Sequence, residues 1–123
     1  MSKRIEEFTQ DGKNFMYIDL SEFKTSEEYR DFFYTAKAYV QKYSEQSLYT
    51  ITNITDVKFD TEVKSLVVEW MEHNRPYVKG GAVIGYNGIK RIFINSIFKL
   101  SGRKNMIFAF SKEQAIEWLL KQE

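Results

Sequence analysis

The apolar residues along the chain follow two spacings that alternate with each other. Short runs typical of strands lie at residues 5–10, 14–20, 47–54, 81–86 and 105–110. Helical spacing follows Thr25 up to residue 43, Asp60 up to residue 74, continues over residues 89–100, and follows Ser111 to the end of the chain. The order ββαβαβαβα predicts an α/β fold: a mainly parallel sheet with an N-terminal antiparallel hairpin strand at one edge and helices on both faces.

Local signals mark where several of these elements begin or end. Asp11-Gly12, between the first two runs, supplies the positive φ that a tight hairpin turn requires. Gly102 closes the third helix. Capping residues precede the other three helices: Thr25 with Glu28 as a capping box, Asp60 as an N-cap, and Ser111 with Gln114 as a second capping box.

The third predicted helix is apolar on more than one side, unlike the other helices. A single stripe facing the core needs fewer apolar positions, so some of these side chains either contact neighbouring elements or face a groove or a partner. A homodimer surface and an apolar ligand pocket beside this helix therefore both remain open. The positions are Ile89, Ile92, Phe93, Ile94, Ile97, Phe98 and Leu100.

Length and composition favour one domain over residues 1–123, large enough to bury about two-thirds of its unfolded surface. Cysteine is absent, which excludes thiol catalysis and disulfides and fits a reducing compartment. The start MSKRIEEF is charged where a signal peptide would be apolar, and no apolar run approaches the ~20 residues of a membrane span. We expect a soluble, cytoplasmic protein.

Charge is segregated along the chain although the net charge is only +1. Residues 74–112 contain no Asp or Glu, and the rest of the chain has 10 basic against 17 acidic residues. This asymmetry predicts a face that attracts anions, unless the charges interleave after folding. The basic residues are Arg75, Lys79, Lys90, Arg91, Lys99, Arg103, Lys104 and Lys112.

An acidic loop joins the third predicted strand to the second helix. Its partner-binding candidates are Asp56, Lys58, Asp60, Thr61 and Glu62. The carboxyl end of a strand is where an α/β protein usually binds its ligands, so we expect a protein partner to dock here. Two alternatives remain open: three carboxylates coordinating Mg²⁺, or a plain N-cap followed by a first-turn glutamate.

This element order, with Asp60-Thr61 at the strand-to-helix junction, resembles the STAS domains: the anti-sigma-factor antagonists and the related stage II sporulation AA-like proteins. The ending, from Phe108-Ala109-Phe110 to Glu117-Trp118-Leu119, is similar to that of the sporulation AA-like group. The resemblance implies a regulatory, protein-binding domain whose fold is related to lipid-transfer modules. In the antagonists the residue after Asp-Ser/Thr is a hydroxyl that a partner kinase phosphorylates.

Here Glu62 stands in the place of that hydroxyl, and Val63 replaces the glycine that follows it. A fixed carboxylate carries one charge where a phosphate carries nearly two. We therefore expect no phosphorylation switch at this position, with Thr61 and Ser65 as the hydroxyls left for modification.

A second candidate site binds an anion or a small ligand at the start of the third helix. Backbone N–H groups at a helix start, beside two cations, favour an anion. The Gly-x-x-Gly spacing lacks the further residues of a phosphate-binding loop, so a plain turn is the alternative. The candidates are Gly85, Tyr86, Asn87, Gly88, Lys90, Arg91 and Phe93.

No arrangement of residues predicts an enzyme, a resident metal or a cofactor. His73, the only histidine, follows Glu72 at a helix end and has no recognisable nucleophile beside it. A pI near 7.8 argues against nucleic acid as a partner. The leading hypothesis is a non-enzymatic STAS-like regulatory or interaction domain that docks a protein partner through its acidic loop. The alternative is a carrier of a small apolar, lipid-like ligand in a pocket beside the third helix.

Overall fold

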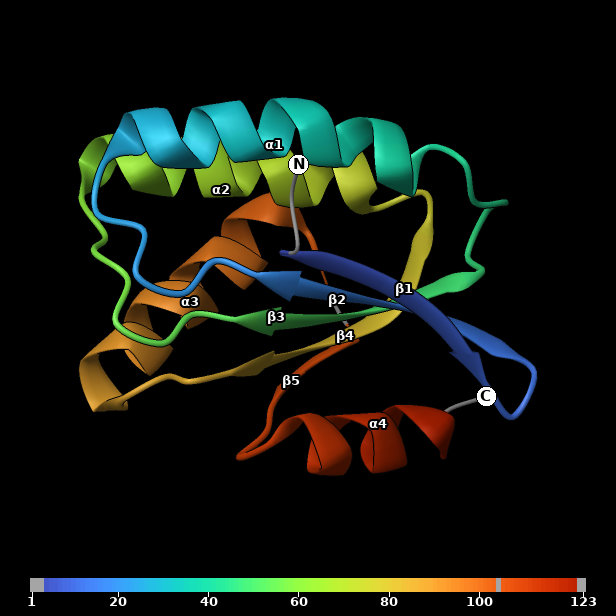
Figure 1. Cartoon of the computed structure of the whole chain (residues 1–123). Helices are drawn as coiled ribbons and strands as arrows, with labels where there is room; N and C mark the ends of the chain where they lie inside the picture. The colour runs from blue at the N-terminus through green and yellow to red at the C-terminus, as the bar shows by residue number, and fades with distance from the viewer. Residues whose placement is uncertain (1–3, 104, 122–123) are drawn as a thin grey trace.

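The structure, a computed structural model, describes residues 4–103 and 105–121 (Figure 1). Strands and helices alternate after an initial pair of strands. In chain order the elements are β1 (Ile5–Gln10), β2 (Lys13–Asp19), α1 (Ser26–Val40), β3 (Leu48–Asn53), α2 (Thr61–Asn74), β4 (Val78–Ile84), α3 (Gly88–Ser101), β5 (Met106–Phe108) and α4 (Lys112–Leu120).

One five-stranded sheet has the order β1-β2-β3-β4-β5, with β1 at an edge. β1 pairs antiparallel with β2, and every other neighbouring pair is parallel. The hairpin turn is tight because Asp11 and Gly12 both have positive φ, 52° and 77°. The predicted α/β fold with its antiparallel edge strand is confirmed.

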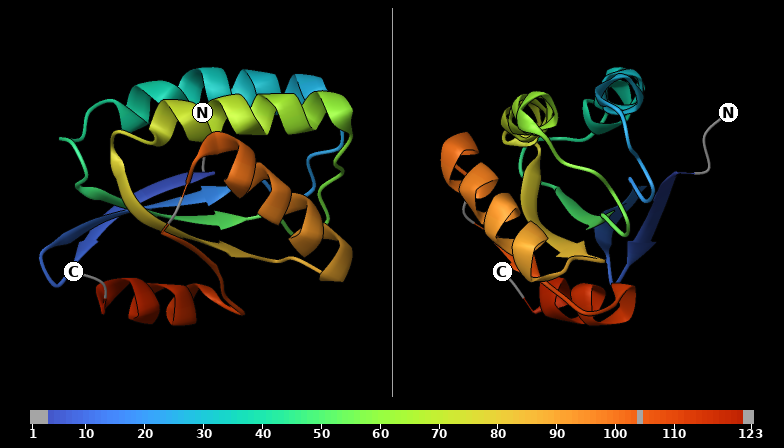
Figure 2. Two further views of the ribbon diagram at one scale, coloured as in Figure 1. Left: turned by 180° about the vertical axis from the view of Figure 1, so that it is seen from behind. Right: turned by 90° about the vertical axis from the view of Figure 1, so that its left-hand side faces the viewer.

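The helices divide unequally between the two faces of the sheet (Figure 2). On one face α1, α2 and α3 lie side by side over a core that includes Tyr29, Trp70 and Ile97. On the other face α4 covers β3 and β4, and Leu119 packs in a smaller core with Tyr49. Helices on both faces are thus confirmed. None of the helices in the described ranges is long and apolar enough to cross a membrane.

Two of the predicted helix caps are present as expected. The Thr25 side chain accepts from the N–H of Glu28, and the Glu28 carboxylate accepts from the N–H of Thr25, which completes the capping box. Asp60 accepts from the N–H of Val63 at 2.8 Å and is the N-cap of α2. These caps satisfy donors that the first turn of a helix leaves free.

Two expectations about element bounds and one about a helix cap were wrong. β4 begins at Val78 rather than at residue 81, because the chain from Val78 pairs with β3 although Lys79 and two glycines interrupt the apolar run. β5 covers three residues instead of six. At α4 only half of the second capping box forms, because the Gln114 side chain accepts from the N–H of Phe110 and not from that of Ser111.

The apolar positions of α3 divide between core and surface. Ile94, Ile97 and Phe98 are buried against the sheet and α2. Phe93 is half-buried at the edge of that core. Ile89, Ile92 and Leu100 are exposed, with 82%, 74% and 60% of their surface accessible. The core alternative therefore holds for the buried subset, and the exposed subset is accessible to solvent.

Candidate functional site

The loops that follow β2, β3 and β4 come together where these strands end, on the left of Figure 1. We call this end of the sheet its carboxyl edge, as distinct from the edge strands β1 and β5. These three strands are parallel, so their carboxyl ends share this edge. The starts of α1, α2 and α3 lie at the same edge, as both the first and second figures show. The predicted partner-binding loop and the predicted anion loop are therefore neighbours, as is usual for sites in such sheets.

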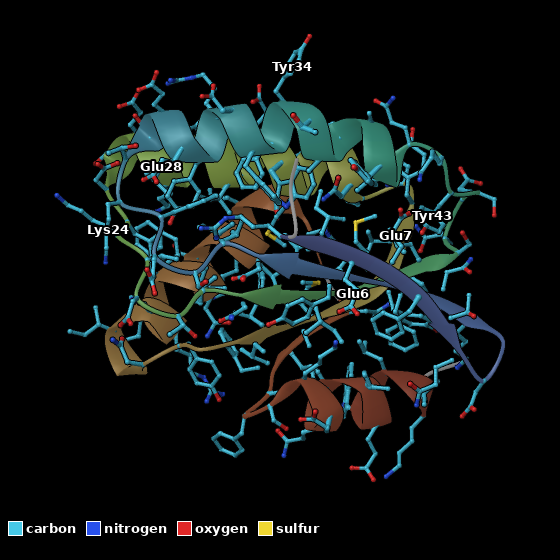
Figure 3. The ribbon with its side chains drawn as sticks, in the orientation of Figure 1. Glu6, Glu7, Lys24, Glu28, Tyr34 and Tyr43 are labelled. Carbon is cyan, nitrogen blue, oxygen red and sulfur yellow. The ribbon has the colours of Figure 1, made fainter. Side chains whose placement is uncertain are left out.

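Hydrogen bonds hold the β3–α2 loop against the loop that follows β2. The N–H of Lys58 donates to the carbonyl oxygen of Phe23 at 2.8 Å. The Tyr29 hydroxyl donates to the carbonyl oxygen of Lys58 at 3.2 Å. The Lys24 ammonium donates to the carbonyl oxygen of Asp56, which has a left-handed φ of 55°. The loop thus keeps one shape through contacts to α1 and to the segment before it; Figure 3 shows Lys24 beside Glu28 at this end of α1.

The side chains of this loop alternate between core and solvent. Val57 is buried and Phe59 is half-buried, and both belong to the core beneath the three helices. Asp56, Lys58 and Asp60 are exposed between them. The apolar anchors therefore present the charged side chains outward on a rigid backbone.

The Asp60-Thr61-Glu62 segment starts α2 and is only partly occupied by contacts within the chain. One Asp60 carboxylate oxygen caps the helix. Glu62 forms an exposed ion pair with Arg30 at 2.9 Å, so its charge is partly compensated by α1. Thr61 is exposed, and the Ser65 hydroxyl donates to the Thr61 carbonyl oxygen at 3.4 Å. The N-cap alternative for Asp60 is thus confirmed, and it leaves the outward face of the segment free to bind.

The metal alternative needs several carboxylates that converge on one point. Across residues 4–103 and 105–121, no group of three or more His, Asp or Glu side chains is arranged to hold a metal ion. Asp56, Asp60 and Glu62 are close in sequence, but Asp60 caps a helix and Glu62 pairs with Arg30. Two of the three carboxylates of this loop therefore already have partners within the chain.

The predicted anion site at the start of α3 is largely occupied by its own side chains. Asn87 is the N-cap, and its side chain accepts from the N–H of Lys90 at 2.9 Å. The Arg91 guanidinium lies over the rings of Tyr86 and Phe108, with its central carbon 4.8 Å from the Phe108 centroid. Such cation–π contacts hold Arg91 against the end of the sheet. Lys90 is half-buried.

The remaining residues of that candidate site have mainly structural contacts. Gly85 has a φ of 80° and packs tightly on the β3–α2 loop, and Gly88 is the first residue of α3. Phe93 stacks on Phe59, with ring centroids 4.5 Å apart and planes 12° apart. The Lys64 ammonium lies 5.7 Å from the centre of the Phe93 ring. The Phe59–Phe93 stack joins the start of α3 to the partner-binding loop.

Two exposed isoleucines extend this edge. On α3, Ile89 lies one turn before Phe93, and Ile92 directly precedes Phe93 in the chain. Both are more than 70% exposed. The sequence alone left these positions undecided, because their helical spacing fits core and surface equally well.

An internal cavity lies beside α3, where the carrier alternative placed its pocket. Its volume is about 40 Å³. Pockets for small-molecule ligands usually measure about 300–1,000 Å³, whereas this volume suits a few water molecules. It is bounded by α2, α3 and the sheet, with Thr50, Asn74 and Arg103 among otherwise mainly apolar side chains.

His73 is held by the amide side chains of Asn74 and Gln41. Its Nδ1 hydrogen-bonds with the Asn74 side chain at 2.9 Å, and its Nε2 with that of Gln41 at 3.0 Å. The ring also stacks beside Trp70, with centroids 6.5 Å apart. The histidine therefore links the ends of α1 and α2.

The buried Tyr29 hydroxyl supports the partner-binding loop, and replacing Tyr29 by Phe is expected to lower the free energy of unfolding by about 1 kcal/mol at pH 7. Burial, with a smaller effect from Glu28 and Asp60, raises the pKa of Tyr29 above its ordinary value of 10. A raised folded pKa stabilises the protein below the unfolded pKa and loses that effect as pH rises beyond it. Urea unfolding should therefore show that the difference in free energy of unfolding between the unmodified protein and Tyr29→Phe shrinks above about pH 10. A constant difference up to pH 11 would contradict this.

Comparison of the chain with protein-family models and with curated protein sequences finds no match. The fold class is therefore defined by the structure alone: an α/β fold whose mixed sheet has three helices on one face and one on the other.

Proposed function

We propose that this protein is a non-enzymatic regulatory or interaction domain that docks a protein partner at the carboxyl edge of its sheet. The observation that carries the proposal is a restrained acidic loop that the Phe59–Phe93 stack joins to the first turns of α3, where two isoleucines are exposed. A docking surface commonly combines an apolar centre with a polar rim. We define the docking edge as Asp56, Lys58, Asp60, Thr61 and Glu62 together with Ile89 and Ile92.

Rigidity of the loop supports this proposal. A surface that already holds its bound shape loses little conformational entropy when a partner binds. Three hydrogen bonds and two inward apolar side chains restrain the segment from Asp56 to Asp60. Its carboxylates favour a partner segment with a basic side chain, and the isoleucines favour apolar side chains beside it.

The resemblance to STAS domains supports the same reading from the sequence side. The Asp60-Thr61 pair stands at the N-terminus of α2, where those domains have their regulatory loop. Glu62 carries a negative charge permanently and is paired with Arg30. We therefore propose a docking domain without a phosphorylation switch at that position. The carrier alternative gains no support from a cavity of about 40 Å³.

The test removes charge or apolar surface from the docking edge without disturbing the fold. Asn tolerates the left-handed conformation of Asp56 and caps helices as well as Asp60 does. Affinity capture from an extract of the cells that make this protein should therefore lose its partner with two double variants. These are Asp56→Asn with Asp60→Asn, and Ile89→Ser with Ile92→Ser. Capture should fall at least about tenfold, because central interface residues contribute more than ~1 kcal/mol each.

Matched controls separate docking from general surface effects. Glu113→Gln with Glu117→Gln removes two exposed charges from α4 on the opposite face. Leu100→Ser removes an exposed apolar side chain from the far end of α3. Both controls should keep the partner. If all four variants retain the same proteins as the unmodified chain, this edge is not the docking surface; native mass spectrometry showing a co-purified small molecule would instead favour the carrier.

A further inference from the structure

Three basic side chains from distant segments meet at the opposite edge of the sheet. A pocket of about 190 Å³ lies where the end of α2, the start of β4 and the end of α3 approach one another. The left view of Figure 2 shows the end of α3 beside the yellow start of β4. No acidic residue lines this pocket among the described residues. Its lining is Gln46, Arg75, Val78, Lys79, Gly102, Arg103 and Asn105.

Helix ends and a bulge in the sheet place the three cations at the pocket. Arg75 is the C-cap of α2, and Arg103 directly follows Gly102, the left-handed C-cap of α3. Lys79 lies opposite no residue of β3, because Leu48 pairs with Val78 and the next residue, Tyr49, pairs with Gly80. Such a bulge re-aims the side chain of the extra residue and is frequent beside binding sites. The irregularity in the sheet thus directs Lys79 to the pocket.

The two arginines of the pocket donate to neutral atoms. The Arg103 guanidinium contacts the Met106 sulfur at 3.2 Å, and Arg75 donates to the Ser101 carbonyl oxygen at 3.4 Å. Within residues 4–103 and 105–121, neither arginine takes part in an ion pair, and nor does Lys79. Burial, and then the neighbouring Arg75, lower the pKa of Arg103 to about 10. Arg103 therefore stays protonated at neutral pH in surroundings that disfavour its charge.

Structural roles do not account for all three residues. Arg75 stabilises the carboxyl end of α3, where carbonyl oxygens carry partial negative charge. That contact explains neither the bulge that exposes Lys79 to the pocket nor the partly desolvated guanidinium of Arg103. A charge that is removed from water usually has a counter-charge. An anion in the pocket would supply that counter-charge.

We propose that this pocket binds a phosphate group. Two guanidinium groups and one ammonium offer several donors to a tetrahedral dianion, and arginine matches phosphate oxygens with two parallel hydrogen bonds. The volume suits a single phosphate group or a small phosphate ester rather than a drug-sized ligand. The site lies at the amino edge of the parallel strands, so it is separate from the docking edge and does not depend on it.

Calorimetric titration of the full chain with inorganic phosphate at low salt tests the proposal. The unmodified protein should bind, and Arg103→Met or Lys79→Met should each weaken binding by about tenfold or more, since a charged hydrogen bond contributes ~1.5–3 kcal/mol. Lys90→Gln with Arg91→Gln removes two cations from the start of α3 and should leave the affinity unchanged. Absence of phosphate binding, or loss of binding only in that control, would overturn the proposal.

Thermal unfolding separates binding from folding. Without phosphate, Arg103→Met should be as stable as the unmodified protein or more stable, because a desolvated charge without a carboxylate is removed. Phosphate should raise the midpoint of the unmodified protein and not that of the variant. A different result would show that Arg103 is structural: Arg103→Met is strongly destabilised, phosphate does not change its unfolding midpoint, and Lys79→Met binds phosphate normally.

A last comparison identifies the source of the phosphate. Dihexanoyl phosphatidic acid, used below its micelle concentration, carries the same group on a short lipid. If it binds more tightly than inorganic phosphate and loses affinity in Lys79→Met, the pocket recognises a lipid headgroup. Equal or weaker binding assigns the site to a water-soluble phosphate.

Discussion

Replacing Trp70 by Ala is expected to lower the free energy of unfolding by about 3–5 kcal/mol. The Trp70 side chain is 4% exposed and stacks on Phe33 of α1, with centroids 4.7 Å apart and planes 10° apart. It also bounds the internal cavity, so its removal would enlarge an existing space that the surrounding backbone cannot close. A loss of this size is a large part of the 5–15 kcal/mol that stabilises a typical domain.

The matched control for this prediction is Tyr34→Ala on α1. Tyr34 is 84% exposed and projects from the outer side of the helix, as Figure 3 shows. Its truncation should change the free energy of unfolding by no more than about 0.5 kcal/mol. Urea unfolding followed by far-ultraviolet circular dichroism measures both variants. Similar midpoints for the two would show that α1, α2 and the sheet are not packed as described.

Gly85→Ala is expected to lower the free energy of unfolding by about 2–5 kcal/mol, combining backbone strain with overpacking. Gly85 has a φ of 80°, which L-residues rarely adopt. A Cβ at this position would clash with the Thr55 hydroxyl and lie 2.6 Å from Asn53 Oδ1 and 2.8 Å from the Thr55 nitrogen. The backbone nitrogen cannot move without moving the β3–α2 loop, so partner capture should weaken as well.

Gly88→Ala, three residues further along, is the control. A Cβ there meets nothing within 4 Å, and Gly88 is the first residue of α3. Alanine in a helix favours folding by reducing the freedom of the unfolded chain, by about 0.4–1 kcal/mol. Thermal unfolding should therefore move in opposite directions for the two variants. Equal stability of Gly85→Ala and Gly88→Ala would contradict the close packing of the two loops.

Most of the signals that act over a few residues were read correctly from the sequence. The Thr25–Glu28 capping box and the Asp60 cap each join groups within three residues, so their hydrogen bonds form whenever the helix forms. The Asp11-Gly12 turn is equally local. Together with the spacing of the apolar residues, these signals predicted the element order. The element order in turn predicted the parallel sheet and the common location of the candidate loops.

Features that depend on pairing with a distant strand were read less well. The start of β4 contains Lys79 and two glycines, a pattern that lacks strand propensity by itself. It forms a strand because β3 supplies its hydrogen-bond partners. The error at Gln114 is local instead, because its side chain accepts from the N–H of Phe110, four residues earlier, a choice that depends on how the chain enters α4.

The amino-acid sequence by itself determined the α/β class, the antiparallel edge strand and the position of the acidic loop, because these follow from periodicity and from caps within one turn. Only the tertiary structure decided which isoleucines of α3 reach solvent and that Phe59 stacks on Phe93. It also brought Arg75, Lys79 and Arg103 into one pocket. Phe59 and Phe93 are separated by 34 residues in the chain and Arg75 and Arg103 by 28, and only packing of the sheet and helices brings such distant positions together.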